Sequence, residues 1–130
     1  IFTSKNAVDA VFSINKNIDK FFNKIYCVGE NTKSLLLKKG QKITKMAQNS
    51  SILADFISKT AKNEEFIFCR SNIKNEEFSI FFKKKNIKLK ELIVYNNVAE
   101  PIKYNQVFDA ILFYSPSGIK SFMTNNSLIN

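Results

Sequence analysis

The sequence predicts an α/β protein in which a parallel sheet is flanked by helices. Two observations support this fold class. Short apolar runs of strand character recur along the chain, and between them apolar residues follow the 3.6-residue period of a helix. Strands that alternate with short helices need crossover connections, which produce parallel pairing. The hydrophobic fraction of 45% is typical of a folded chain.

The elements of the first half alternate regularly. "IFT" predicts a strand over residues 1–3, and a helix is expected over residues 6–12. "KIYCV" predicts a strand over residues 24–28, followed by a helix over residues 33–39, which Gly40 is expected to end. A strand over residues 43–46 precedes a helix over residues 51–61, for which Ser50 or Ser51 can serve as N-cap. The apolar residues of this helix share one face: Ile52, Leu53, Phe56 and Ile57.

The second half continues the pattern and then interrupts it. Strands are predicted over residues 66–69, 92–95 and 110–114, and helices over residues 75–85 and 118–124. The segment "NNVAEPIKYNQ" has no clear period and contains Pro101, so we expect a crossover between two domains at residues 97–103. Because the chain begins inside a strand at Ile1 and stops soon after its last helix begins, we expect an internal fragment of a longer protein.

Composition excludes some functions and leaves others open. The net charge of +9 suits polyanions such as nucleic acid, acidic lipid or acidic small molecules, but a lysine- and asparagine-rich composition also follows from an AT-rich coding sequence. The chain has no histidine, which excludes a Ser-His-Asp triad or a Cys-His pair within it. No apolar run approaches the roughly 18 residues of a membrane span. Cys27 and Cys69 lie in apolar runs and are expected to be reduced, buried thiols of an intracellular protein.

Small polar residues follow the predicted strands. "IFTSKNA", "CVGENTKS", "FCRSNIKN" and "FYSPSGIK" each place Ser, Thr, Asn or Gly where a strand turns into a helix. Such turns leave free N–H groups at the positive end of the helix dipole. Because ligands of parallel sheets collect at the carboxyl ends of the strands, these turns predict a row of anion-binding sites. The alternative is ordinary helix capping, which every α/β protein needs.

One of these phrases occurs twice. When "IFTSKNAV" is laid on "LFYSPSGI", Phe2 aligns with Phe113 and Ser4 with Ser115. The chain as a whole resembles the uroporphyrinogen-III synthase family of tetrapyrrole (heme) biosynthesis. The segments that carry the resemblance are "IFTSKNAV", "YCVGENTKSLLLKKG", "SSILADFI", "FCRSNIKNEEF", "ELIVYNNVAEP" and "AILFYSPSGIKSF", in the order and spacing of the family.

The resemblance implies two similar α/β domains, one inserted into the other. Residues 1–96 would be the inserted domain without its first strand, residues 97–103 the inter-domain crossover, and residues 104–130 the beginning of the returning segment of the second domain. The fragment alone would be inactive, and residues 104–130 would pack on the inserted domain, pair with another chain or remain loosely held. The full-length enzyme would be a cytoplasmic monomer.

The implied activity is the cyclisation of hydroxymethylbilane, a linear polycarboxylate tetrapyrrole, to uroporphyrinogen III. Water is lost and the last pyrrole ring is inverted, without a metal or organic cofactor. Tyr95 matches the family's "VYxT" tyrosine and would assist departure of the hydroxyl group, although an ordinary strand tyrosine would look the same. Thr32 matches a threonine that would contact a carboxylate or act as an N-cap. The other residues implied to bind substrate are Ser4, Asn6, Ser71, Asn72, Ser115, Ser117 and Gly118.

The family pattern is not matched everywhere. Ser71 stands where the family often has glycine, and Asn97 stands where it usually has threonine. Two other classes of function stay open at this stage: a two-lobed anion-binding module without catalysis, and a basic domain that binds single-stranded nucleic acid. The aromatic residues are mostly phenylalanines inside apolar runs, which favours a core role over base stacking.

Overall fold

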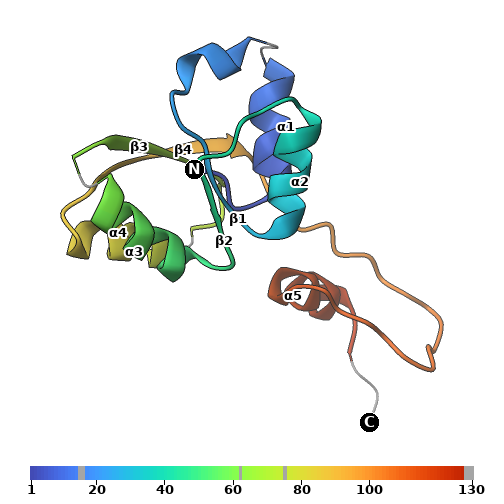
Figure 1. The fold of residues 1–130 in the computed structure, drawn as a ribbon. Coiled ribbons are helices and arrows are strands. Elements are labelled where there is room, and N and C mark those ends of the chain that lie inside the picture. The colour runs from blue at the N-terminus through green and yellow to red at the C-terminus, as the bar shows by residue number, and fades with distance from the viewer. Residues whose placement is uncertain (15–16, 62, 75, 128–130) are drawn as a thin grey trace. The chain divides into compact units, whose positions relative to one another are not determined.

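The computed structural model describes residues 1–14, 17–61, 63–74 and 76–127. The chain divides into two compact units, Ile1–Asn96 (unit 1) and Asn97–Asn130 (unit 2). Figure 1 shows the elements, which follow one another in this order: α1 (Lys5–Ile14), the 3₁₀-helix η1 (Ile18–Phe21), β1 (Tyr26–Val28), α2 (Glu30–Lys38), β2 (Lys45–Ala47), α3 (Ser50–Thr60), β3 (Glu65–Ser71), α4 (Glu76–Lys84), β4 (Lys88–Tyr95) and α5 (Pro116–Asn125).

Unit 1 contains a parallel sheet whose centre is the start of the chain. Phe2 forms parallel bridges with Cys27 of β1 and with Cys69 of β3. β2 pairs with β1 and β4 pairs with β3, both in parallel. The order across the sheet is therefore β2, β1, residues 1–3, β3, β4. The short connecting helices and right-handed crossovers predict that residues 1–3, 24–28 and 66–69 are neighbours in one parallel sheet. This prediction is confirmed, as is the predicted alternation of parallel strands with helices.

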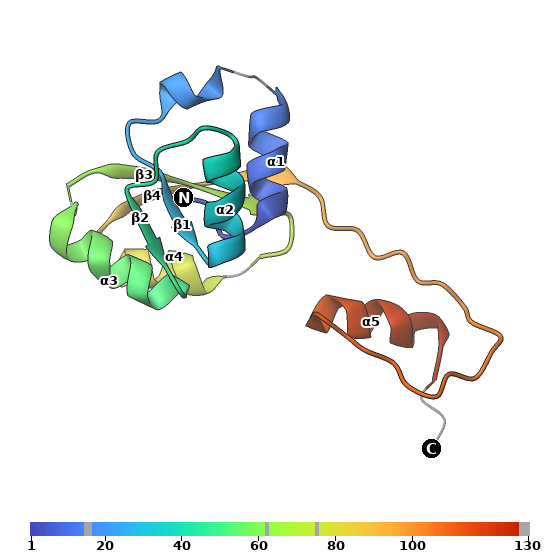
Figure 2. The ribbon, with the colours of Figure 1, turned by 45° about the vertical axis from the view of Figure 1, so that its right-hand side comes forward.

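Helices cover both faces of this sheet (Figures 1 and 2). α1 and α2 bury Val8 and Leu36 against one face, together with both cysteines. α3 and α4 bury Leu53, Ile57, Phe78 and Phe82 against the other face. α1 follows residues 1–3 and α4 follows β3. These two helices thus lie on opposite faces of the sheet, although the strands before them are neighbours. Such a topological switch point leaves a crevice outside the carboxyl ends of the strands, where α/β proteins bind ligands.

Some predicted boundaries are wrong for identifiable reasons. α3 is capped by Asn49 and not by Ser50 or Ser51: the Asn49 side chain accepts a hydrogen bond of 3.0 Å from the N–H of Ile52. Residues 110–114 form no strand, since a strand needs a partner for its backbone groups and unit 2 offers none among its described residues. β4 begins at Lys88, four residues earlier than predicted. The predicted helix over residues 75–85 is observed as α4, and its first predicted residue lies outside the described residues.

Gly40 occupies the position after the α2 C-cap, as its place in the sequence predicts. Its φ of +76° lies in the left-handed region that favours glycine. The N–H of Gly40 donates to the carbonyl of Leu37 (2.9 Å), and the N–H of Gln41 donates to that of Leu36 (3.0 Å). These two hydrogen bonds form a Schellman motif, which satisfies the last carbonyls of the helix.

Both cysteines are free and buried, as predicted. They lie on the two strands that flank Phe2. Burial raises the pKa of the Cys27 thiol to about 11 and also raises the pKa of Cys69. Because the thiolate is the reactive form, both side chains are unreactive core residues at neutral pH.

Unit 2 consists of an extended segment that folds back on α5. Asn126 links the two, since its side chain donates to the carbonyls of Ile102 (2.7 Å) and Phe122 (2.9 Å) and accepts from the N–H of Tyr104 (2.9 Å). None of the α5 residues is buried. In the described part of the whole chain, no helix has the length and apolar character needed to cross a membrane.

Candidate functional site

A crevice lies at the carboxyl edge of the unit 1 sheet, at the switch point. It encloses about 280 Å³. Its walls come from the ends of residues 1–3, β1, β3 and β4 and from the beginnings of α3 and α4; the lining residues are Thr3, Ser4, Val28, Ser50, Phe68, Arg70, Ser71, Ile73, Phe78 and Tyr95. The lining residues Val28, Phe68, Ile73 and Phe78 are apolar, and the others carry hydroxyl groups and one guanidinium group.

Ser4 is the N-cap of α1. Its Oγ accepts a hydrogen bond of 3.2 Å from the N–H of Ala7, which is the third residue of the helix. The same Oγ lies 3.3 Å from the hydroxyl oxygen of Tyr95, and either group can be the donor. The N-cap of α1 and the last residue of β4, which are 91 residues apart in the sequence, therefore meet in the crevice.

A β-bulge brings Tyr95 to this point. Arg70 of β3 pairs with Ile93 of β4, but the next residue, Ser71, pairs with Tyr95. β4 therefore has one extra residue, Val94, and the side-chain alternation of a regular strand is broken. Val94 and Tyr95 both pack against the core cluster of α1 and α2. Without the bulge, Tyr95 would face α4 and could not reach Ser4.

Arg70 lines the crevice from β3, the strand next to residues 1–3. Its side chain is only 14% exposed. Its Nε donates to Glu91 of β4 at 2.5 Å, and its Nη1 donates to the carbonyl of Ser71 at 2.7 Å. Glu91 also accepts a hydrogen bond from the hydroxyl of Ser79 on α4. The guanidinium is therefore fixed by β3, β4 and α4 together.

Glu91 gives this network a pH dependence. The hydrogen bond from Ser79, followed by the hydrogen bond and charge of Arg70, holds the pKa of the Glu91 carboxyl below its usual value of 4.5. Since the folded-state pKa is lowered, the stabilisation is present above about pH 4.5 and is lost as the pH falls through the folded-state pKa.

We therefore expect Glu91→Gln to lower the free energy of unfolding by up to about 1 kcal/mol at pH 7, the scale of a partly exposed ion pair. The difference from the parent protein should shrink below pH 4.5, as measured by urea unfolding at a series of pH values. Parallel curves for the two proteins over this range would show that Ser79 and Arg70 do not stabilise the carboxylate.

The other residues predicted for unit 1 are spread around this edge of the sheet. Ser71 lines the crevice, and Asn72 is exposed beside it, with its N–H donating to the carbonyl of Tyr95 at 3.2 Å. Asn6 is exposed on α1 and is not among the lining residues. Thr32 is buried in the first turn of α2 and does not line the crevice either.

The N-cap role considered for Thr32 is wrong. Gly29 is the N-cap of α2, with a φ of +86° that favours glycine. Thr32 stands three residues further, inside the helix, and is 4% exposed. The turn from β1 into α2 needs the left-handed residue directly after the strand, which places the threonine on the helix itself.

The second copy of the repeated phrase has the same local structure in unit 2. Ser115 is the N-cap of α5, and its Oγ accepts a hydrogen bond of 3.1 Å from the N–H of Gly118, as Ser4 accepts from Ala7. Ser117 is exposed, with its hydroxyl 3.1 Å from that of Ser115. A Cβ at Gly118 would lie 3.3 Å from Ser115 Oγ, so the glycine leaves room for this cap.

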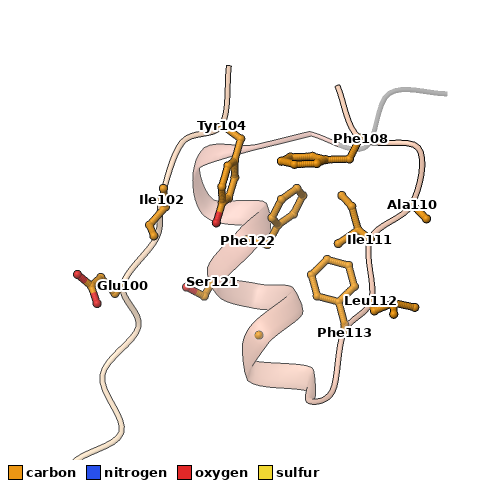
Figure 3. A pocket seen from close by; sticks show the side chains of 11 residues that line it. Glu100, Ile102, Tyr104, Phe108, Ala110, Ile111, Leu112, Phe113, Ser121 and Phe122 are labelled. Carbon is orange, nitrogen blue, oxygen red and sulfur yellow. The ribbon is translucent and has the colours of Figure 1, made fainter. Parts of the chain in front are cut away.

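Unit 2 has a cavity of its own, of about 480 Å³ (Figure 3). Aromatic rings form one wall: Phe122 stacks on Tyr104 at 6.1 Å between ring centroids and meets Phe113 edge-on at 5.5 Å. Gly118 and Ser121 contribute the α5 side. Of the three residues predicted in unit 2, only Gly118 lines this cavity.

From the sequence, Arg70 and Thr3 were not singled out and Ser50 was considered only as an N-cap, although all three line the unit 1 crevice. A usable signal existed for Arg70. It is the charged residue directly after the apolar run "FIFC", where β3 reaches the carboxyl edge of the sheet. Its partner Glu91 could not be found this way, because the pairing of β3 with β4 brings the two together across 21 residues.

The fold defines a doubly wound α/β protein with a crevice at its switch point that carries hydroxyl groups and a guanidinium group. The chain belongs to the uroporphyrinogen-III synthase family, because the family model described as "Uroporphyrinogen-III synthase HemD" matches residues 1–127. The resemblance seen in the sequence is thereby confirmed over almost the whole chain. A comparison with curated proteins finds no match.

Proposed function

We propose that the protein is a uroporphyrinogen-III synthase that cyclises hydroxymethylbilane to uroporphyrinogen III. Membership of the family supports the reaction class. The observation that carries the proposal is the contact between the Ser4 and Tyr95 hydroxyls at the switch-point crevice, since it brings two predicted site residues of distant sequence position together. In this proposal unit 1 is the inserted domain and unit 2 begins the returning segment of the second domain.

Tyr95 has the chemistry that the first step needs. The hydroxyl group of the linear substrate leaves as water, and it must gain a proton or a strong hydrogen bond as its C–O bond breaks. A phenol is such a donor, and Ser4 orients it from 3.3 Å. The pyrrole nitrogens of the substrate supply the electrons, so no oxidant or cofactor is required. The ring then closes with inversion of the last pyrrole.

The rest of the machinery holds the substrate. A flexible polycarboxylate needs many donors at fixed positions, because its reactive ends must meet in one geometry. Hydroxyl groups and the N–H groups at helix N-termini can donate hydrogen bonds to carboxylates, so few cations need to be buried. Ser4, Ser71 and Asn72 are the proposed donors of unit 1, with Thr32 and Asn6 at the adjacent helix starts, and Ser115, Ser117 and Gly118 form the corresponding turn of unit 2.

The nucleic-acid alternative receives no support from the aromatic residues of unit 1. Phe66, Phe68, Phe78 and Phe82 are buried and pack on one another in the core. Base stacking needs exposed rings along a groove. Phe21 is exposed, but a single exposed ring does not form a row of stacking platforms, and the other aromatic residues described in this unit are buried or half-buried.

A cyclisation assay tests the proposed function directly. The full-length protein is mixed with freshly prepared hydroxymethylbilane, and the products are oxidised and separated into the type I and type III isomers. We expect the inverted type III isomer in excess, because uncatalysed closure gives the uninverted type I isomer. Type I product alone, formed at the rate of the protein-free control, would refute the proposal.

A further inference from the structure

Arg70 is the charged side chain in the wall of the crevice, and its place there is not explained by capping or by the core. It stands at the end of β3, one residue before the predicted site residue Ser71. Its side chain is largely buried beside Phe68 and Ile73, yet it lines the crevice together with Ser4 and Tyr95. An arginine held at the edge of a ligand crevice is suited to an anionic group of the ligand.

The hydrogen bonds of Arg70 show which part of it is available. A guanidinium has five N–H donors in one plane. Glu91 accepts from Nε, and the carbonyl of Ser71 accepts from Nη1. Both interactions hold the group from the side of the strands. Two of the five donors are used in this way. Because Nη1 and Nη2 carry two N–H groups each, the Nη end of the plane can still offer one N–H from each atom to a carboxylate, through two parallel hydrogen bonds.

We propose that Arg70 is a specificity-determining residue that binds one carboxylate of the ligand in the switch-point crevice, and that Glu91 and Ser79 position it. This inference rests on the proposed function for the nature of the ligand. It adds a side-chain cation to a site otherwise built from hydroxyl groups and backbone N–H groups. The hydroxyls of Ser4 and Tyr95 line the same crevice and can donate further hydrogen bonds to an anion bound there.

The charged residues around Arg70 determine whether it binds a ligand carboxylate by long-range attraction or by hydrogen bonds. Glu91 carries a negative charge next to Arg70, and Lys74 is paired with Glu76 nearby. The net charge of the group is therefore close to zero, so a ligand carboxylate gains little from long-range attraction. Directional hydrogen bonds from the planar guanidinium must provide the binding. A lysine, which is a point charge without this fork, cannot replace them.

The test uses the full-length protein and uroporphyrin I, a stable tetrapyrrole with eight carboxylates whose binding is followed by its fluorescence. We expect Arg70→Gln to weaken binding by about 10- to 100-fold, the scale of a hydrogen bond between charged groups. Arg70→Lys should weaken it by at least about 5-fold despite the retained charge. In the cyclisation assay KM should rise by a similar factor while kcat changes less than about threefold, because the contact holds the substrate and does not take part in bond breaking.

The chain offers a matched control. Lys88 and Glu65 form a cross-strand ion pair of 3.5 Å between the same two strands, at the end away from the crevice. Lys88→Gln removes one positive charge, as Arg70→Gln does, and should leave uroporphyrin binding within about twofold of the parent protein.

Several outcomes would overturn the inference. If Arg70→Gln binds uroporphyrin I as tightly as the parent protein but melts at a lower temperature, Arg70 only links β3 to β4. If Arg70→Lys binds uroporphyrin I as tightly as the parent protein, a positive charge alone is sufficient. Absence of uroporphyrin binding by the parent protein would overturn it as well. If Arg70→Gln does not fold, Arg70→Lys decides. Arg70-dependent binding by a protein that forms no type III isomer would refute the proposed function and leave the carboxylate contact standing.

Discussion

Replacing Tyr95 by phenylalanine is expected to lower kcat for cyclisation roughly 100-fold, the scale of general acid assistance. The change removes one hydroxyl group and very little packing. In the parent protein that hydroxyl lies 3.3 Å from Ser4 Oγ at the crevice, where a leaving hydroxyl of the substrate would be within reach. KM should change much less, since the proposed carboxylate contacts remain in place.

The measurement must be made before the linear substrate closes by itself, and the type III isomer must be counted separately. Tyr26→Phe is a suitable control, because it removes a phenol from a buried ring that packs on Phe66 and does not line the crevice. Equal kcat for Tyr95→Phe and the parent protein would remove Tyr95 from the chemistry and leave positioning of the substrate as the source of catalysis.

The largest effect on stability is expected for Phe82→Ala, which should lower the free energy of unfolding by about 3–5 kcal/mol. Phe82 of α4 is fully buried, and its ring lies 4.8 Å from that of Phe78 and 5.8 Å from that of Phe66. Truncation leaves a cavity between α4 and the sheet that the rings of Phe78 and Phe66 can fill only by leaving their present packing. Because whole domains are stable by only about 5–15 kcal/mol, the loss should be visible as a melting temperature lowered by at least about 12 °C.

Ile80→Ala is the matched control on the same helix. Ile80 is 47% exposed, so its truncation should cost about 0.5 kcal/mol. Circular dichroism during guanidinium unfolding compares both variants with the parent protein. A loss of similar size for Phe82→Ala and Ile80→Ala would show that the cluster under α4 is not the core of unit 1.

The local structure of the chain could be predicted well from its sequence. The periodic spacing of apolar residues located the five α-helices. In α3, for example, Leu53 and Ile57 are four residues apart and both are buried. The repeated phrase marked Ser4 and Ser115 as equivalent, and both cap helices through the residue three positions on. Capping and helix faces depend on neighbours within one or two turns, which a single sequence contains.

The site could be predicted only in part. Ser4, Ser71 and Tyr95 were identified from the family resemblance, and all three line one crevice. Arg70 and Ser50 were missed, and the proposed roles of the site residues stay predictions until activity is measured. The strand expected over residues 110–114 is absent because backbone pairing needs a partner strand, and no local pattern reveals whether one is present.

The sequence by itself determined the alternation of strands and helices, the buried face of α3, the capping roles of Ser4 and Ser115 and membership of the uroporphyrinogen-III synthase family. These features depend on residues close together in the chain. The tertiary structure decided which residues meet at the crevice. The bulge at Val94 turns Tyr95 toward Ser4, and the pairing of β3 with β4 sets Arg70 against Glu91. The physical reason is that strand order and register join segments up to 91 residues apart, and a shift of one residue reverses the face of every side chain that follows.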